Sequence, residues 1–490
     1  MNVAAKFSSP LDVASLPTGL FIDGQWRRGT EGKTIDVIDP SNGNVIVSVA
    51  DATVDDAMDA IASAHRAAKG WAATAPRKRS EILRRCFELM IESKDMLAEL
   101  ISLENGKTLN DAQGEVSYAA EFFRWFAEEA VRLNGEISTS PSGANKIIVQ
   151  HQPIGVAVLV TPWNFPAAMA TRKIGPALAA GCTCVLKPAT ETPLTALVLA
   201  NLYKQAGVPD GVVNVVTTSQ SGPVVSAMLN DPRVRKLSFT GSTEVGRTLL
   251  REAAGTVVSC SMELGGNAPF IIFDDADLDA AIEGAMVAKM RNGGEACTAA
   301  NRFYVQSGIA EAFSAGLVER MKLMKVGAGY DPKSQCGPLI NRKAVERLTE
   351  LVTDATARGA KVLVGGGPLD GQGYFFAPTV LSGVLPDSRI SAEEIFGPIA
   401  ALTTFDTEDE VNELANATEY GLISYVYTRD LARGMRVSEQ MDSGMVGLNR
   451  GLVSDPAAPF GGMKQSGLGR EGAHLGILEF CETKYIAVSW

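Results

Sequence analysis

The chain has 490 residues, of which 46% are hydrophobic and 21% are charged; at roughly 100–200 residues per domain this predicts two to four folded domains and argues against a disordered or fibrous chain. Its 45 lysines and arginines against 56 aspartates and glutamates give a formal net charge of −11, so nucleic acid and anionic membrane surfaces are poor partners. Seven cysteines and three histidines exclude a disulfide scaffold and leave little for a metal site.

The N-terminal sequence gives no sign of export. It lacks the apolar core behind basic residues that typifies a signal peptide, and no run in the chain reaches the ~20 apolar residues that span a bilayer. We therefore expect a soluble cytoplasmic protein with reduced thiols, no membrane contact and no bound metal.

The chain begins with a short hairpin and a long helical stretch. We expect an extended arm over residues 1–20, followed by a strand, a tight turn at Asp23-Gly24 and a second strand. Residues 51–134 carry apolar side chains at steps of three and four, which predicts helices. The aromatic residues within 122–126 continue an apolar helix face, and we interpret them as core packing.

From residue 145 onward, short apolar strands alternate with helices. This alternation predicts a parallel sheet with crossover helices. The strands are expected at 146–149, 156–160, 184–186, 212–216 and 236–239, and the helices at 193–206 and 221–229. A second α/β stretch covers 268–455, and the tail at 472–490 holds a short helix and a final strand.

Two glycine-bearing loops are candidates for nucleotide binding. The glycine-rich run at 365–371 follows a strand, but no helix opens after it, so we interpret it as a hairpin loop. Residues 238–246 are a better candidate, because a helix follows Gly241 and can be capped by Ser242. An ordinary capped strand–turn–helix has the same pattern, and the residues alone leave both interpretations open.

Three side chains have the chemistry of a catalytic centre. Cys297 follows a Gly-Gly pair, which suits a partly exposed thiol, although a lone cysteine is more often a small buried residue. Glu263 lies in an apolar segment, where a carboxyl pKa can rise enough for a base; a solvated surface glutamate is the alternative. Asn164 lies between prolines and aromatic residues, so it is either a rigid amide donor for an oxyanion or part of a structural turn.

Together these features resemble the aldehyde dehydrogenase superfamily along nearly the whole chain. The matching segments occur in family order: TPWNFP at 161–166, LKPA at 186–189, FTGSTEVG at 239–246, ELGG at 263–266, GEAC at 294–297, EIFGP at 394–398 and PFGG at 459–462. The resemblance implies that Cys297 is the nucleophile, that Asn164 and the Cys297 N–H form an oxyanion hole, and that Glu263 activates the water that hydrolyses a thioester. Ala299 stands where some members carry a second cysteine, so no regulatory disulfide is expected.

The resemblance also implies a nicotinamide dinucleotide cofactor. The residues expected to bind it are Thr161, Pro162, Trp163, Lys187, Thr190, Gly241, Ser242, Glu394 and Phe396. Many members have a glutamate at the position of Thr190, where it accepts hydrogen bonds from the ribose and repels a 2′-phosphate. An uncharged threonine can donate to phosphate, so we favour NADP, with NAD as the alternative.

Within the superfamily, the chain most resembles the succinate-semialdehyde dehydrogenase subfamily, which implies a place in γ-aminobutyrate degradation. The positions of Arg172, Arg291 and Ser454 match residues that grip the distal carboxylate of the substrate, a role that suits the guanidinium fork. We expect oxidation of succinate semialdehyde to succinate. The alternatives are another semialdehyde such as glutarate semialdehyde, a coenzyme A-acylating variant, and a non-enzymatic binding protein.

The implied fold class is α/β and aldehyde dehydrogenase-like, with a Rossmann-type cofactor domain, an α/β catalytic domain and a small β oligomerisation element. We place the cofactor domain at 1–130 with 151–262, the catalytic domain at 263–455, and the oligomerisation element at 131–150 with 456–490. Strands in the last element would expose edges that invite pairing with another subunit, so a homodimer or homotetramer is expected.

Overall fold

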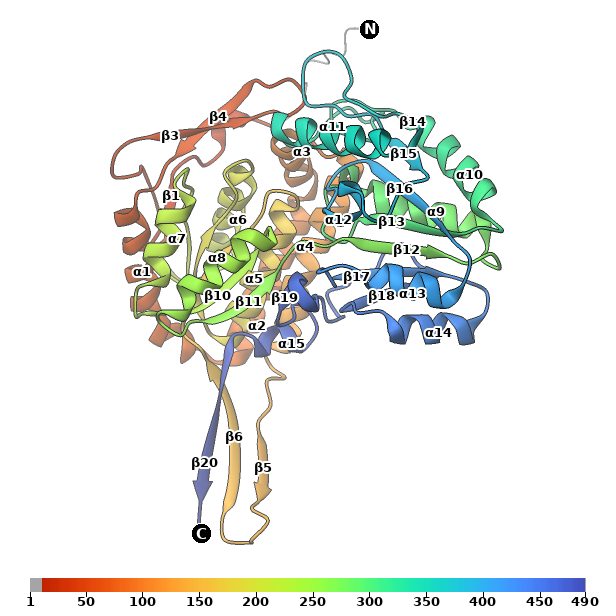
Figure 1. Ribbon diagram of the computed structural model, residues 1–490. Helices are drawn as coiled ribbons and strands as arrows, with labels where there is room; N and C mark the ends of the chain where they lie inside the picture. Colours follow the sequence, from red (N-terminus) through yellow and green to blue (C-terminus); the bar gives the residue numbers. More distant parts are fainter. Residues whose placement is uncertain (1–10, 490) are drawn as a thin grey trace.

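The computed structural model describes residues 11–489, and two large sheets form its body (Figure 1). The first sheet has eight strands in the order β19-β11-β10-β7-β8-β9-β1-β2. In that order they are β19 (Gly467–Leu468), β11 (Ser259–Glu263), β10 (Val234–Thr240), β7 (Val156–Val160), β8 (Thr183–Lys187), β9 (Val213–Val215), β1 (Leu20–Ile22) and β2 (Gln25–Arg27). The run from β11 to β9 is parallel, which confirms the predicted parallel sheet.

The N-terminal hairpin is confirmed. Asp23 (φ 54°) and Gly24 (φ 71°) form the turn between the antiparallel strands β1 and β2. Residues 1–10 of the expected extended arm lie outside the described residues, and the remainder includes a short 3-10 helix, η1 (Val13–Ser15). A separate two-stranded sheet, β3 (Thr34–Ile38) with β4 (Val45–Ala50), precedes the helical stretch.

Helices cover both faces of the first sheet. The alternation of side chains along β7 shows this: Val156, Val158 and Val160 belong to one buried cluster, whereas Ala157 and Leu159 belong to another. The helices are α1 (Val54–Ala72), α2 (Pro76–Glu92), α3 (Lys94–Asn105), α4 (Leu109–Glu129), α5 (Pro166–Ala180), α6 (Pro193–Gln205), α7 (Ser221–Leu229) and α8 (Thr243–Ala254). Both predicted crossover helices are therefore present as α6 and α7.

Helix α4 carries the predicted aromatic face. Phe122, Phe123 and Phe126 are buried in the cluster that contains α2, α5 and α6, while Trp125 is partly buried against it, so the core-packing interpretation is confirmed. All residues of α5 are buried, and α4 and α5 pack closely together. This packing matters below, because α5 begins at the loop that carries Asn164.

The second sheet has seven strands in the order β14-β15-β16-β13-β12-β17-β18. They are β14 (Lys361–Val364), β15 (Thr379–Ser382), β16 (Ile399–Phe405), β13 (Ala300–Gln306), β12 (Ala268–Ile272), β17 (Ile423–Tyr427) and β18 (Met445–Leu448). Strands β14 and β15 are antiparallel, so the glycine-rich run between them is a hairpin connection, as predicted. The associated helices are α9 (Leu278–Met290), η2 (Arg291–Gly294), α10 (Ala310–Lys322), α11 (Arg342–Ala357), α12 (Arg389–Ala392), α13 (Glu408–Asn416) and α14 (Leu431–Gln440).

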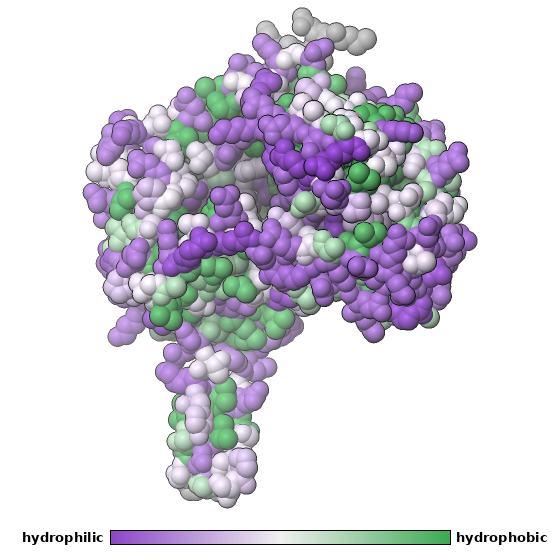
Figure 2. Space-filling view, viewed as in Figure 1, coloured by the Kyte–Doolittle hydropathy of each residue, from purple (hydrophilic) through white to green (hydrophobic). Residues whose placement is uncertain are grey.

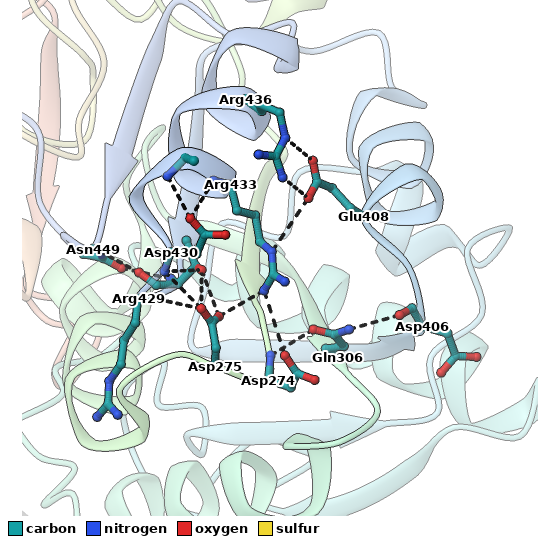
Figure 3. A network of polar contacts seen from close by, with 12 residues as sticks. Asp274, Asp275, Gln306, Asp406, Glu408, Arg429, Asp430, Arg433, Arg436 and Asn449 are labelled. Carbon is teal, nitrogen blue, oxygen red and sulfur yellow. Dashed lines mark hydrogen bonds and ion pairs between the residues drawn. The ribbon is translucent and has the colours of Figure 1, made fainter.

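A polar network ties the outer helices of the second sheet together (Figure 3). Arg433 contacts Asp275 at 3.1 Å in the loop before α9, and Arg436 contacts Glu408 at 2.9 Å at the start of α13. Asp275 also accepts from the backbone N–H of Asp430, the N-cap of α14. The network fixes α13, α14 and this loop relative to one another.

A third sheet projects from the body (Figure 1). It has the order β20-β6-β5, with β20 (Cys481–Val488), β6 (Lys146–Pro153) and β5 (Glu136–Thr139), and all pairings are antiparallel. A short turn, η3 (Lys464–Ser466), and α15 (Leu475–Leu478) precede β20. Ile137 is 73% exposed and Tyr485 is 58% exposed, and Figure 2 shows hydrophobic residues along this arm. The division of the chain into domains stays a prediction.

Over residues 11–489, no helix has the length and apolarity needed to cross a bilayer. All seven cysteines are free thiols: Cys86, Cys182, Cys184 and Cys336 are buried, and Cys260, Cys297 and Cys481 are half-buried. The placement of Cys297 sets it apart from the others, as described next.

Candidate active site

A cavity of about 860 Å³ opens where parallel strands of the first sheet end. Strands β7, β8 and β10 end at Val160, Lys187 and Thr240, and the carboxyl edge of a parallel sheet is where α/β proteins bind ligands. Residues predicted from the sequence line this cavity: Thr161, Pro162, Trp163, Asn164, Lys187, Thr190, Gly241, Ser242, Cys297, Glu394 and Phe396. The structure therefore brings together residues that lie more than 200 positions apart in the chain, such as Thr161 and Phe396.

The lining of this cavity fits a nicotinamide dinucleotide. Ser242 is the N-cap of α8 and accepts from the Val245 N–H at 3.4 Å, so the predicted cap is present and the helix begins at the cavity. Lys187 is 6% exposed and forms no ion pair within residues 11–489; burial lowers the pKa of its ammonium to about 8. Such a cation suits ribose hydroxyls or a phosphate. Trp163 and Phe396 pack edge-to-face with ring centroids 5.4 Å apart, so apolar surface adjoins the polar groups.

Glu394 enters the cavity from the second half of the chain. Its carboxylate accepts from the Gly266 N–H at 3.0 Å, and burial raises its pKa to about 7. A Cβ on Gly265 would lie 2.9 Å from a Glu394 carboxylate oxygen. The Glu394 side chain can therefore lie this close to the backbone of residue 265 because that residue has no side chain. This contact joins the end of β11 to the loop before β16.

Cys297 lies where the large cavity meets a smaller one, since both cavities are lined by Cys297 and Met169. The backbone of Gly266 lies against that of Cys297: a Cβ atom on residue 266 would lie 2.5 Å from the Cys297 carbonyl oxygen. Burial raises the pKa of the Cys297 thiol to about 12, while the positive charge of Arg172 acts in the opposite direction. The thiol is therefore protonated at neutral pH in the resting site.

Glu263 is the last residue of β11 and is 3% exposed, which eliminates the alternative of a solvated surface glutamate. Both carboxylate oxygens are buried, and neither has a hydrogen-bond partner in the described part of the chain. This burial raises the pKa of Glu263 well above its usual range, although the nearby cations Arg172 and Lys173 oppose the rise. Glu263 lines neither cavity, but its charge acts on Cys297.

Asn164 is buried, and its side chain faces the segment that carries Cys297. Its Nδ2 donates to the backbone oxygen of Glu295 at 3.0 Å, two residues before the thiol. The backbone oxygen of Asn164 accepts from Asn292 Nδ2 at 2.9 Å and from Lys107 Nζ at 2.7 Å. Hydrogen bonds with Glu295, Asn292 and Lys107 therefore fix the position of Asn164.

Lys107 and Glu115 form a buried ion pair behind Asn164, with Nζ and Oε2 2.5 Å apart. The other Glu115 oxygen accepts from the N–H groups of Ala167 and Ala168, at 2.8 and 3.2 Å, in the first turn of α5. The pair therefore satisfies two N–H groups at the buried N-terminus of α5 and holds the Asn164 loop. The motifs did not indicate either residue.

The smaller cavity lies on the other side of Cys297. The predicted substrate residues Arg172, Arg291 and Ser454 all line it. Arg172 is 1% exposed, pairs through Nε with Glu471 and lies 4.2 Å above the Phe460 ring. Lys173 pairs with the same carboxylate at 2.6 Å. The Arg172 guanidinium is therefore rigidly held, with one edge engaged by protein.

Arg291 approaches this cavity from the opposite side. Its Nη2 lies 3.3 Å from Thr298 Oγ1, and its guanidinium carbon lies 5.2 Å from the Phe165 ring centre.

The residues near the site that the sequence analysis missed share a pattern: Asp111, Glu115 and Tyr118 follow one another at steps of four and three, on one face of α4. Polar residues on an otherwise buried helix face are the signal that could have indicated them.

Comparisons with known proteins identify the family of this chain. The model of the aldehyde dehydrogenase family matches residues 26–486. A succinate-semialdehyde dehydrogenase of Paenarthrobacter nicotinovorans is 54% identical over 91% of this chain and 99% of its own length, and a glutarate-semialdehyde dehydrogenase of Pseudomonas aeruginosa is 50% identical over 96% of this chain and 97% of its own. The crystal structure of an E. coli NADP-dependent enzyme has a TM-score of 0.96 and 49% identity, covering 97% of this chain and 98% of that one. The chain belongs to the aldehyde dehydrogenase family and is an oxidoreductase with that family's α/β fold.

Proposed function

We propose that this enzyme oxidises an aldehyde with a distal carboxylate, succinate semialdehyde first, to the dicarboxylate. The observation that carries the proposal is the smaller cavity, in which Arg172 and Arg291 share a lining with the Cys297 thiol. A guanidinium binds carboxylate through paired hydrogen bonds, and a buried cation favours an anionic partner. Ser454 offers a further donor.

Glutarate semialdehyde is the second candidate, because one of the relatives above is named for it and the two substrates differ by one methylene group. A hydrophobic pocket discriminates one methylene by only about 10–200-fold, so both aldehydes are expected to react to different extents. A coenzyme A-acylating reaction is disfavoured, because Glu263 can direct water to the thioester.

The reaction begins when the Cys297 sulfur attacks the aldehyde carbon. Because burial raises the pKa of this thiol, its proton must leave as the C–S bond forms, and we assign Glu263 as the base that takes it. The Asn164 amide has two N–H donors; one is used by the Glu295 oxygen, and the other serves the oxyanion of the thiohemiacetal.

A nicotinamide dinucleotide held in the large cavity would supply the hydride acceptor for this oxidation, and the chain's part is to keep the acyl group on Cys297 as a thioester. Glu263 then takes a proton from the water that attacks the thioester carbon. The C–S bond breaks, the carboxylate leaves, and the Cys297 sulfur regains a proton. Lys187 and Glu394 are the residues we assign to the two riboses, Ser242 to the pyrophosphate, and Phe396 to the nicotinamide side.

Members of this family use NAD or NADP, and we infer that this enzyme prefers NADP. Thr190 and the α7 N-terminal residues Ser221 and Gly222 line the same cavity, so uncharged donors are available to a 2′-phosphate. Replacing Thr190 with glutamate should lower kcat/KM with NADP relative to NAD by about tenfold, which is the effect of losing roughly one charge-assisted hydrogen bond. The matched control is Glu191→Gln, which removes a neighbouring carboxylate and should shift the ratio slightly toward NADP. An unchanged ratio in Thr190→Glu would place the specificity elsewhere.

We also propose a homodimer or homotetramer built through the projecting sheet. The edge strand β20 and the exposed side chains Ile137 and Tyr485 are the features that support it. Sedimentation analysis of the wild type and of Ile137→Lys tests this. A wild-type monomer, or an unchanged assembly in the variant, would contradict the assignment of the interface.

The substrate proposal is tested by steady-state kinetics with succinate semialdehyde, glutarate semialdehyde and butanal, which has the carbon chain of the first without its carboxylate. We expect the two semialdehydes to have the higher kcat/KM. Arg291→Ala should raise KM for the semialdehydes far more than for butanal. If butanal is the best substrate of the wild type, the carboxylate-binding role of the smaller cavity is wrong.

A further inference from the structure

Tyr118 is a residue of the smaller cavity that the family motifs leave unexplained. It lies on α4, two turns after Asp111 and one turn after Glu115, and it lines the cavity together with Arg172, Arg291, Cys297 and Ser454. Its ring packs edge-to-face on Phe122, with centroids 4.9 Å apart. The ring is thereby fixed beside the cavity.

The Tyr118 hydroxyl oxygen is buried, and the Arg172 guanidinium acts on it as a donor, but no acceptor for the O–H proton lies within hydrogen-bond distance in the described part of the chain. A buried hydroxyl without an acceptor is unfavourable, so native structures rarely leave one unless a ligand or water completes it. Burial also raises the pKa of this phenol, so the O–H proton is present as a donor at neutral pH.

The groups around this hydroxyl are donors. No carboxylate lines the smaller cavity, and the two charged residues that do line it, Arg172 and Arg291, are cations that act electrostatically on Tyr118. The nearby carboxylate of Glu471 is already engaged by Arg172 and Lys173. What this arrangement lacks is an acceptor with negative charge.

We propose that Tyr118 is a specificity-determining residue whose O–H donates a hydrogen bond to the distal carboxylate of the substrate, alongside Arg172 and Arg291. The inference rests on the proposed function, since it assumes a substrate with an anionic end. The phenol donates a single hydrogen bond from a fixed direction, so it favours a carboxylate over a neutral or bulkier end group.

The experiment compares Tyr118→Phe with a matched control, Tyr203→Phe. Tyr203 is also a buried tyrosine whose hydroxyl has no partner in residues 11–489, and it packs edge-to-face on Phe123, the neighbour of Phe122, with centroids 5.5 Å apart. It lines neither of the two cavities at Cys297. Each variant keeps its ring and loses only an oxygen, so folding should be preserved in both.

In Tyr118→Phe we expect KM for succinate semialdehyde to rise about tenfold or more, with kcat unchanged and kcat/KM for butanal unchanged. Tyr203→Phe should alter neither substrate. A parallel loss for both aldehydes in Tyr118→Phe, or an unchanged preference for the semialdehyde, would overturn the inference while leaving the proposed function intact. A wild-type preference for butanal would instead overturn the proposed function itself.

Discussion

The two cavities that meet at Cys297 are built in opposite ways. The larger one is assembled mainly from turns that follow parallel strands, where Gly241 and Gly265 let backbone and ligand approach closely. The smaller one is lined mostly by uncharged side chains and contains two arginines, of which Arg172 is held by Glu471. In the proposed function, the cofactor would therefore be recognised largely through backbone shape, and the anionic substrate through fixed positive charges.

The strongest test of this comparison removes the group that the two cavities share. Cys297→Ala should lower dehydrogenase kcat by on the order of 10⁴-fold or more, because no other thiol lines either cavity in the described structure. Affinity for the dinucleotide, measured by calorimetry, should persist. Cys260→Ala, which alters a half-buried thiol elsewhere, serves as the control and should retain full activity. Substantial turnover by Cys297→Ala would refute a covalent mechanism.

The next test concerns Glu263, the proposed base. Glu263→Gln should reduce turnover by about 10²–10⁴-fold, the usual contribution of a positioned base. Because the pKa of Glu263 is raised and its active form is deprotonated, wild-type kcat should increase as pH rises through that pKa. The variant should lack this ascending limb and show a burst of reduced cofactor as thioester accumulates. The same pH profile in both proteins would assign the limb to another group.

A somewhat smaller effect is expected at the oxyanion donor. Asn164→Ala removes the amide that we propose donates to the reacting oxygen, and kcat should fall by about 10²–10³-fold. Thermal unfolding of the variant separates this loss from a folding defect. If kcat stays within the wild-type range, the N–H groups of the backbone suffice and the role given to Asn164 is wrong.

The smallest catalytic effect is expected from the Lys107–Glu115 ion pair. This pair tests the comparison of the two cavities, because Lys107 contacts the Asn164 loop of the larger cavity. Lys107→Met leaves Glu115 buried without its cation, so the free energy of unfolding should fall by about 3–5 kcal/mol. The double variant Lys107→Met/Glu115→Leu should recover part of that stability. Its kcat should remain below the wild-type value, though above that of Asn164→Ala, because the Asn164 carbonyl loses one of its two donors and keeps the one from Asn292.

Urea unfolding and steady-state rates on the same samples separate the two roles of this ion pair. Wild-type kcat in the double variant would mean that Lys107 contributes to folding alone. The measurement therefore distinguishes a positioning role from a purely structural one.

The difference between the cavities also explains what the sequence could predict. Residues of the larger cavity lie in short contiguous motifs after predicted strands, so Thr161 to Asn164, Gly241 and Ser242 could be placed before the fold was known. Lys107, Glu115 and Tyr118 lie in a helical stretch whose apolar pattern indicated packing, and that interpretation is right for their neighbour Phe122. Their function depends on which loop α4 packs against, and no local pattern encodes that contact.

The projecting sheet has a practical consequence for anyone who prepares the protein. Strand β20 is an edge strand whose last paired residue, Val488, lies opposite Lys146. Residues appended there would extend from the sheet edge that we expect a second subunit to contact. An affinity tag or fluorescent fusion at this end would compete with assembly, and one that lengthens the strand could join the sheet itself.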